Sequence, residues 1–170
     1  MSIKLIGAVL VIAASGGFGI TIAASHRREV KYLRQLLAIL DYMECELQYR
    51  LTPLPQLCKQ SALEASGLLK TALQAFSTEL ENQVSPDVSS CMTAAVSHSP
   101  ELPTHTKSCL LCLGQSLGKF DLQGQLKGLE YARQFCREKL EMLENNKEVR
   151  LRSYQTLCLC AGAALAILLI

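Results

Sequence analysis

The sequence predicts an all-α fold, in which a six-helix cytoplasmic bundle lies between an N-terminal and a C-terminal transmembrane helix. Three observations predict it. A long uncharged, apolar run lies near each end of the chain, the segments between these runs repeat their apolar residues with the helical period, and no segment alternates like a strand. We expect a transmembrane helix at residues 1–25, the bundle at 26–153 and a second transmembrane helix at 154–170.

The first apolar segment, residues 5–25, reads LIGAVLVIAASGGFGITIAAS and carries no charge. A helix needs roughly 20 such residues to cross the hydrocarbon of a bilayer. Its small residues Ala23, Ala24 and Ser25 also allow a cleaved signal peptide. The retained anchor is favoured, because the run is longer than a signal-peptide core and the basic segment HRREVKYLR follows directly.

The last segment, YQTLCLCAGAALAILLI, is also uncharged, and about 17 residues are near the short limit for a span. A buried core helix is the alternative, but the segment has no polar face. Basic residues flank both spans on the side of the bundle, so we expect residues 25–153 to be cytoplasmic. Anionic lipid head groups also explain basic residues at these positions. These residues are Arg27, Arg28, Lys31, Arg34, Lys147, Arg150 and Arg152.

Between the spans, residues 30–51 predict the first helix of the bundle, with a heptad seam on one side. The seam consists of Leu33, Leu37, Leu40, Glu44, Leu47 and Leu51. Glu44 interrupts it, either as a glutamate whose stem packs while its carboxylate reaches a partner, or as a buried carboxylate in a functional contact. Thr52 and Pro53 then end this helix, and Thr52 is expected to cap the next one.

Three shorter helices are predicted at residues 53–64, 68–82 and 85–97. Ser66 and Gly67 are expected to end the first of them. The segment SHSPELPTHT, residues 97–106, contains two prolines and is expected to be a surface connection.

The last two helices are predicted at residues 107–117 and from residue 121 to the membrane, joined within the stretch LGQSLGKFDLQG. Gly118 suits the left-handed position just past a helix end, and Asp121 suits the N-cap of the long helix. Gly114 lies inside a helix, where glycine is costly, so another helix is expected to approach it closely. The stretch therefore predicts a tight helical hairpin.

The eight cysteines raise the question of a metal or redox site. His105, Cys109 and Cys112 share one helical face, and His98 is the nearest candidate for the fourth ligand that zinc requires. Three ligands along one helix have poor geometry for zinc, and cytoplasmic cysteines usually pack as small hydrophobes. We expect no metal, but a metal- or redox-responsive protein that uses these residues is the main alternative.

Other motifs for chemistry are missing. The chain has no phosphate-binding G-x-x-x-x-G-K-[ST] motif and no arrangement of Ser, His and Asp near a glycine-rich turn. Glu44 and Glu46 are two residues apart on a helix, so their carboxylates face different ways. The net charge of +2, without a basic stripe or tryptophan, does not indicate nucleic-acid binding. We expect neither an enzyme nor a cofactor.

Two long motifs resemble those of the stage III sporulation protein AB family. They are Leu113-Gly114-x-x-Leu117-Gly118-x-x-Asp121-x-x-x-Gln125 and Leu40-Asp41-x-x-Glu44-x-Glu46-Leu47-x-Tyr49-x-x-Thr52-Pro53-Leu54, and the terminal AGAALAILLI is similar as well. The resemblance implies a membrane component of the channel between mother cell and forespore. It implies a bundle like the cytoplasmic domains of the type II secretion system protein F.

The resemblance further implies a location in the outer forespore membrane, with a cytoplasmic secretion-type ATPase and other sporulation channel membrane proteins as partners. A homo-oligomer is left open, and so is a simple lipid-binding hairpin. The candidate partner-binding residues are Glu44, Glu46, Tyr49, Gly114, Gly118, Asp121 and Gln125, although caps, turns and packing also explain them.

Overall fold

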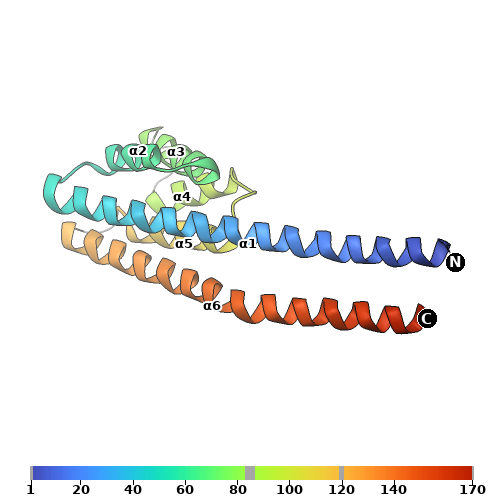
Figure 1. Cartoon of the computed structure of the whole chain (residues 1–170). Coiled ribbons are helices and arrows are strands. Elements are labelled where there is room, and N and C mark those ends of the chain that lie inside the picture. Colours follow the sequence, from blue (N-terminus) through green and yellow to red (C-terminus); the bar gives the residue numbers. More distant parts are fainter. Residues whose placement is uncertain (1, 83–86, 119–120, 170) are drawn as a thin grey trace. The chain divides into compact units, whose positions relative to one another are not determined.

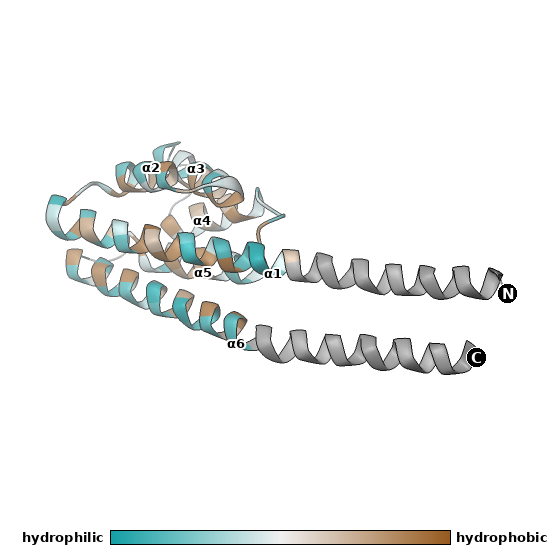
Figure 2. Cartoon of the chain, in the orientation of Figure 1, coloured by the Kyte–Doolittle hydropathy of each residue, from teal (hydrophilic) through white to brown (hydrophobic). Residues whose placement is uncertain are grey.

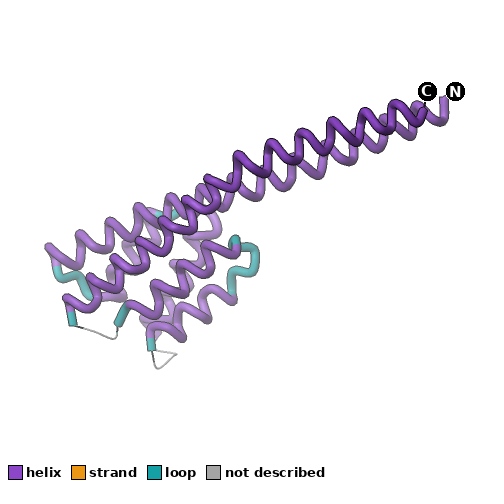
Figure 3. The backbone as a smooth tube through the Cα atoms, turned by 90° about the horizontal axis from the view of Figure 1, so that it is seen from below, coloured by secondary structure: helices purple, strands orange, loops and turns teal. Residues whose placement is uncertain are grey.

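A computed structural model describes the backbone of residues 2–82, 87–118 and 121–169, and the side chains of residues 24–82, 87–118 and 121–145. Within these ranges the chain forms six α-helices and no strand, as Figures 1 and 3 show. The helices are α1 (Ser2–Arg50), α2 (Leu54–Glu64), α3 (Gly67–Asn82), α4 (Val88–Ser97), α5 (Thr104–Ser116) and α6 (Leu122–Leu169). The predicted all-α fold and its order of helices are confirmed.

The chain divides into two compact units. One, Lys31–Leu140, is the bundle and contains all of α2 to α5. The other combines the two ends of the chain, Met1–Val30 and Glu141–Ile170. Among the described side chains, no helix has both the length and the apolar character required to cross a membrane. The predicted spans at residues 5–25 and 154–170 lie outside those side chains, except for residues 24 and 25.

Within the bundle the helices run alternately in opposite directions, and α2 packs on α3, α3 on α4 and α4 on α5. The long helix α1 contacts α2 on one side and α6 on the other. The Tyr42 hydroxyl donates to Oε1 of Gln60 on α2 at 3.2 Å. On the other side, Sγ of Cys136 on α6 donates to the carbonyl oxygen of Leu33 at 3.6 Å. The first and last helices of the bundle are therefore neighbours.

Apolar side chains from every helix form the core, and Figure 2 shows them as hydrophobic bands alternating with hydrophilic ones along α1 and α6. Of the predicted seam on α1, Leu33, Leu40 and Leu47 are buried, as expected. The seam prediction is wrong at its end, where Leu51 is 66% exposed. The reason is that α1 ends at Arg50, so Leu51 no longer follows the helical period.

The predicted break between α2 and α3 is confirmed. Gly67 has a φ of 62°, and a Cβ added to it would lie 3.0 Å from the hydroxyl oxygen of Tyr32 on α1. The same hydroxyl accepts a hydrogen bond from the Leu68 amide at 3.4 Å, and the Gln35 amide donates to Oγ of Ser66 at 2.6 Å. Glycine is needed here because it combines a left-handed turn with close approach of α1.

One prediction about the connections is wrong. Thr52 does not cap α2, because Pro53 holds the N-cap position and the Thr52 hydroxyl donates to Oε2 of Glu46 at 3.1 Å. The predicted surface connection at residues 97–106 is confirmed between α4 and α5, where Pro100 and Glu101 are exposed and only Ser99 and Leu102 are buried; α5 begins at Thr104, three residues earlier than predicted. For α4, residues 85 and 86 lie outside the described residues, and Asp87 caps the helix by accepting from the Ser90 amide at 2.9 Å.

Candidate partner-binding site

The hairpin between α5 and α6 has the predicted geometry at both of its ends. Leu117 is the C-cap of α5 and its amide donates to the Leu113 carbonyl oxygen at 3.2 Å. Gly118 follows with a φ of 78°, a conformation that glycine adopts without a Cβ clash. Oδ1 of Asp121 accepts from the Gly124 amide at 2.9 Å, which is the predicted N-cap of α6. The two turn residues between Gly118 and Asp121, at positions 119 and 120, lie outside the described residues.

The expected close approach at Gly114 is confirmed, and α4 is the helix that makes it. A Cβ added to Gly114 would lie 2.5 Å from Cβ of Met92 and 3.7 Å from Cα of Ser89. Contacts under 3 Å cannot be accommodated without a shift, so the glycine sets the distance between α4 and α5.

Gly118 brings the two sequence motifs together. A Cβ added there would overlap Cγ2 of Val88 and lie 3.6 Å from Cδ2 of Leu54, the residue that ends the first motif. The motifs are far apart in the sequence, yet both lie at one end of the bundle, where α1 ends and α6 begins (Figure 1). This end is opposite residues 31 and 140, where the chain enters and leaves the bundle.

A third close approach was missed by the sequence analysis. A Cβ added to Gly128 on α6 would lie 2.7 Å from Cβ of Ser116 and 2.9 Å from its carbonyl oxygen. The last turn of α5 therefore packs directly on the α6 backbone. The signal in the sequence was a glycine inside a helical pattern, as at Gly114.

Glu44 joins α1 to α6 through a residue that the sequence analysis did not single out. Nη1 of Arg133 lies 2.7 Å from Oε2 of Glu44 and 3.2 Å from Oδ1 of Asp41, and Nη2 lies 3.0 Å from Oε1 of Glu130. The hydrogen bonds that Arg133 donates to Asp41 and Glu130, more than the charge of Glu44, raise the pKa of Arg133. Glu44 is half-buried and paired within the chain, as the first of the two readings expected.

Glu46 faces a different side of α1 from Glu44, as their spacing of two residues predicted. It is buried, and its Oε1 accepts from Nη1 of Arg50 at 3.0 Å while Oε2 accepts from Thr52. Tyr49 is 77% exposed. Gln125 lies in the first turn of α6, where its backbone amide donates to the Asp121 backbone carbonyl oxygen at 2.9 Å.

The structure separates the seven candidates into two groups. Glu44, Glu46, Gly114, Gly118, Asp121 and Gln125 make contacts that hold helices and turns together. Tyr49 points into solvent instead, which leaves it as the candidate whose side chain is available to a partner.

The alternative site on α5 does not form a metal centre in the described part of the chain, where no three His, Cys, Asp or Glu side chains come together as ligands. Cys109 is buried, and none of the cysteines that the structure describes forms a disulfide. Burial, and to a smaller extent the neighbouring Cys109, raises the pKa of Cys112. A raised pKa reduces the thiolate that metal binding and redox chemistry require.

Comparison with known proteins gives consistent results. The profile of the family described as stage III sporulation protein AB matches residues 4–170. Stage III sporulation protein AB of Bacillus subtilis (strain 168) is 33% identical over 79 residues, which are 46% of this chain and 46% of that protein. The match therefore spans about half the length of this relative.

A solved structure of stage III sporulation protein AB has a similar fold, with a TM-score of 0.63 and 23% identity. The similarity covers 72% of this chain and 98% of that chain. The fold, both motifs and the match over residues 4–170 agree, and the chain belongs to the stage III sporulation protein AB family.

Proposed function

We propose that this protein is a non-enzymatic membrane platform of the sporulation channel between mother cell and forespore. Its ends anchor it in the outer forespore membrane and join other membrane proteins of the channel. Its bundle faces the mother-cell cytoplasm and docks a secretion-type ATPase. Membership of the sporulation family supports the setting, and the resemblance of the bundle to the protein F domains suggests the platform role.

The observation that carries this proposal is the meeting of the two motifs at one end of the bundle. Their polar residues cap helices, close turns and join α1 to α6, so they build a rigid surface and leave no pair of groups arranged for acid–base chemistry in the described residues. A rigid end of the bundle, where α1 ends and α6 begins, suits a contact with a partner. This supports binding over catalysis.

The experiment that tests docking uses the full-length protein in lipid nanodiscs and the secretion-type ATPase of the same organism. We expect saturable binding at micromolar concentration, measured by biolayer interferometry. Empty nanodiscs of the same lipid provide the control. A response equal to that of the empty discs would overturn the docking role.

The orientation has a separate test, because Cys45 is an exposed thiol on α1 while Cys58, Cys91, Cys109 and Cys136 are buried. In vegetative cells that express the protein in their plasma membrane, a membrane-impermeant maleimide should label Cys45 in inside-out vesicles and leave it unlabelled in intact cells. The Cys45→Ala variant identifies the labelled residue. Labelling of Cys45 in intact cells would place the bundle on the wrong side of the membrane.

A further inference from the structure

Three cationic side chains follow the uncharged segment of α1 and share one side of this helix. Arg27, Arg28 and Lys31 are exposed, whereas Tyr32 and Leu33, the next two residues, are buried. Because α1 is a single helix from Ser2 to Arg50, Lys31 lies about one turn from both arginines, at spacings of three and four residues. We call Arg27, Arg28 and Lys31 the basic face of α1.

The basic face has no carboxylate partner among the described residues. Arg50, Lys59 and Arg133 each pair with a glutamate, but no ion pair in the described part of the chain includes a member of the basic face. Like charges at spacings of three and four residues destabilise a helix. A negatively charged ligand would therefore lower the electrostatic free energy of this segment.

The distance along α1 indicates which negatively charged group lies within reach. Residues 5–25 carry no charge, and a helix rises about 1.5 Å per residue, so the two arginines follow the end of this segment by about 3–5 Å and Lys31 by about 9 Å. The head-group layer of a bilayer is roughly 5–7 Å thick on each side of the hydrocarbon. With residues 5–25 in the hydrocarbon, both arginines lie among the lipid phosphates, and the long side chain of Lys31 reaches back towards them.

We propose that the basic face of α1 binds the phosphate groups of anionic phospholipids. Each guanidinium offers paired donors that match a phosphate, and Lys31 adds a compact positive charge. This inference rests on the membrane anchoring in the proposed function and adds a lipid of defined charge as a partner. Basic residues that served only to orient the chain during insertion would give the assembled protein no preference among lipids.

The test measures the lipid preference of the full-length protein in phosphatidylcholine vesicles with a trace of spin-labelled phosphatidylglycerol or spin-labelled phosphatidylcholine. Electron paramagnetic resonance gives the fraction of labelled lipid that the protein immobilises. The wild type should prefer phosphatidylglycerol by about threefold or more. The triple variant Arg27→Gln/Arg28→Gln/Lys31→Gln should lose at least about half of this preference, and so should the wild type in about 0.5 M NaCl.

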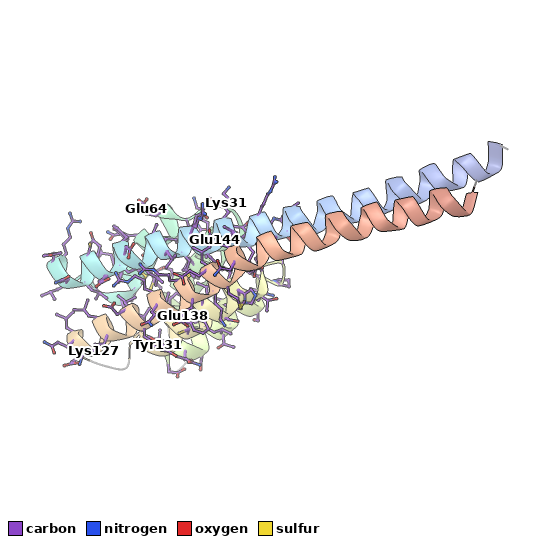
Figure 4. All side chains as sticks on the ribbon, turned by 60° about the horizontal axis from the view of Figure 1, so that its bottom comes forward. Lys31, Glu64, Lys127, Tyr131, Glu138 and Glu144 are labelled. Carbon is purple, nitrogen blue, oxygen red and sulfur yellow. The ribbon has the colours of Figure 1, made fainter. Side chains whose placement is uncertain are left out.

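Two further variants separate the basic face from total charge and from folding. Lys59→Gln/Lys127→Gln/Arg137→Gln removes three exposed cations elsewhere, among them Lys127 on α6, away from Lys31 (Figure 4). The variant Arg27→Lys/Arg28→Lys/Lys31→Arg keeps the charge of the basic face. Both should retain most of the wild-type preference.

The outcomes distinguish this inference from the anchoring on which it rests. A wild type that immobilises both lipids equally, or a triple glutamine variant of the basic face that keeps the wild-type preference, would overturn lipid binding and leave the anchoring intact. An equal loss of preference in the control with Lys127→Gln would also overturn it. A wild type that immobilises neither lipid would overturn the anchoring as well.

Discussion

At the scale of single residues, Gly118 shows how one position is constrained twice. Its φ of 78° is unfavourable for any side chain, and the space that a Cβ would need is taken by Val88 on α4. The same residue separates α5 from the N-cap of α6. A conformational and a packing constraint therefore coincide where the two motifs meet.

The Gly118→Ala substitution should lower the free energy of unfolding by about 2–4 kcal/mol. The left-handed backbone costs about 1–2 kcal/mol with a Cβ, and overpacking against Val88 adds a similar amount. Chemical denaturation followed by circular dichroism measures the loss. Gln115→Ala, at an exposed position in the last turn of α5, should change stability by less than about 0.5 kcal/mol. Equal losses in both variants would contradict this reasoning.

The buried thiol of Cys58 makes the stability of the bundle depend on alkaline pH. Burial raises the pKa of the Cys58 thiol from its ordinary value of 9.0 to about 12. Because the pKa of Cys58 is higher in the folded than in the unfolded state, the protonated thiol contributes its full stabilisation below pH 9.0. This contribution is lost as the pH rises towards about 12. Between these two pH values, the free energy of unfolding should fall with pH less steeply for Cys58→Ala than for the wild type, by about 1.4 kcal/mol per pH unit.

Urea denaturation between pH 8 and pH 10.5, about half of that window, measures this slope. Cys45→Ala serves as the control, since Cys45 is exposed and its loss removes no buried group. If the free energy of unfolding declined equally with pH for the wild type and Cys58→Ala, Cys58 would not be the cause of the loss of stability at alkaline pH.

At the scale of helices, Arg133 is the main polar tie between α1 and α6 among the described residues. One guanidinium holds two carboxylates on α1 and one on its own helix, and its side chain is 24% exposed. Removing the cation would leave the half-buried Glu44 close to Asp41 and Glu130 with no opposite charge. The pairing therefore fixes how α1 and α6 lie against each other.

We expect Arg133→Met to cost about 1–3 kcal/mol of stability and to speed amide hydrogen exchange in residues 36–47 and 126–140. Arg137→Met, an exposed arginine one turn further along α6, provides the matched control and should change neither quantity measurably. Adding Glu44→Gln to Arg133→Met should recover part of the loss, because the unpaired charge is removed as well. A double variant that is less stable than either single one would contradict the direct pairing.

At the scale of the whole molecule, the bundle and the two chain ends are separate units, and only the bundle has a described core. A shortened chain of residues 26–153 should therefore fold without lipid. We expect it to remain in the supernatant after ultracentrifugation and to unfold cooperatively, whereas the full-length chain sediments with membranes. Circular dichroism and fractionation measure these properties. A full-length chain that stays in the supernatant without detergent would contradict the proposed anchoring.

The amino-acid sequence by itself was sufficient for the features that depend on neighbouring residues. Helix periodicity identified all six helices, and glycine and aspartate chemistry placed the turn at Gly118 and the cap at Asp121, because such preferences act over a few residues. The glycine inside α5 even predicted that another helix lies against it.

Only the tertiary structure decided which distant groups meet. Arg133 is 89 residues from Glu44, and nothing in local spacing indicates their pairing. The predicted inward position of Leu51 was wrong, because the helix ends one residue earlier and tertiary packing turns the leucine outward. Pairing across helices depends on the relative rotation and register of packed elements, which a periodic pattern in one helix does not contain.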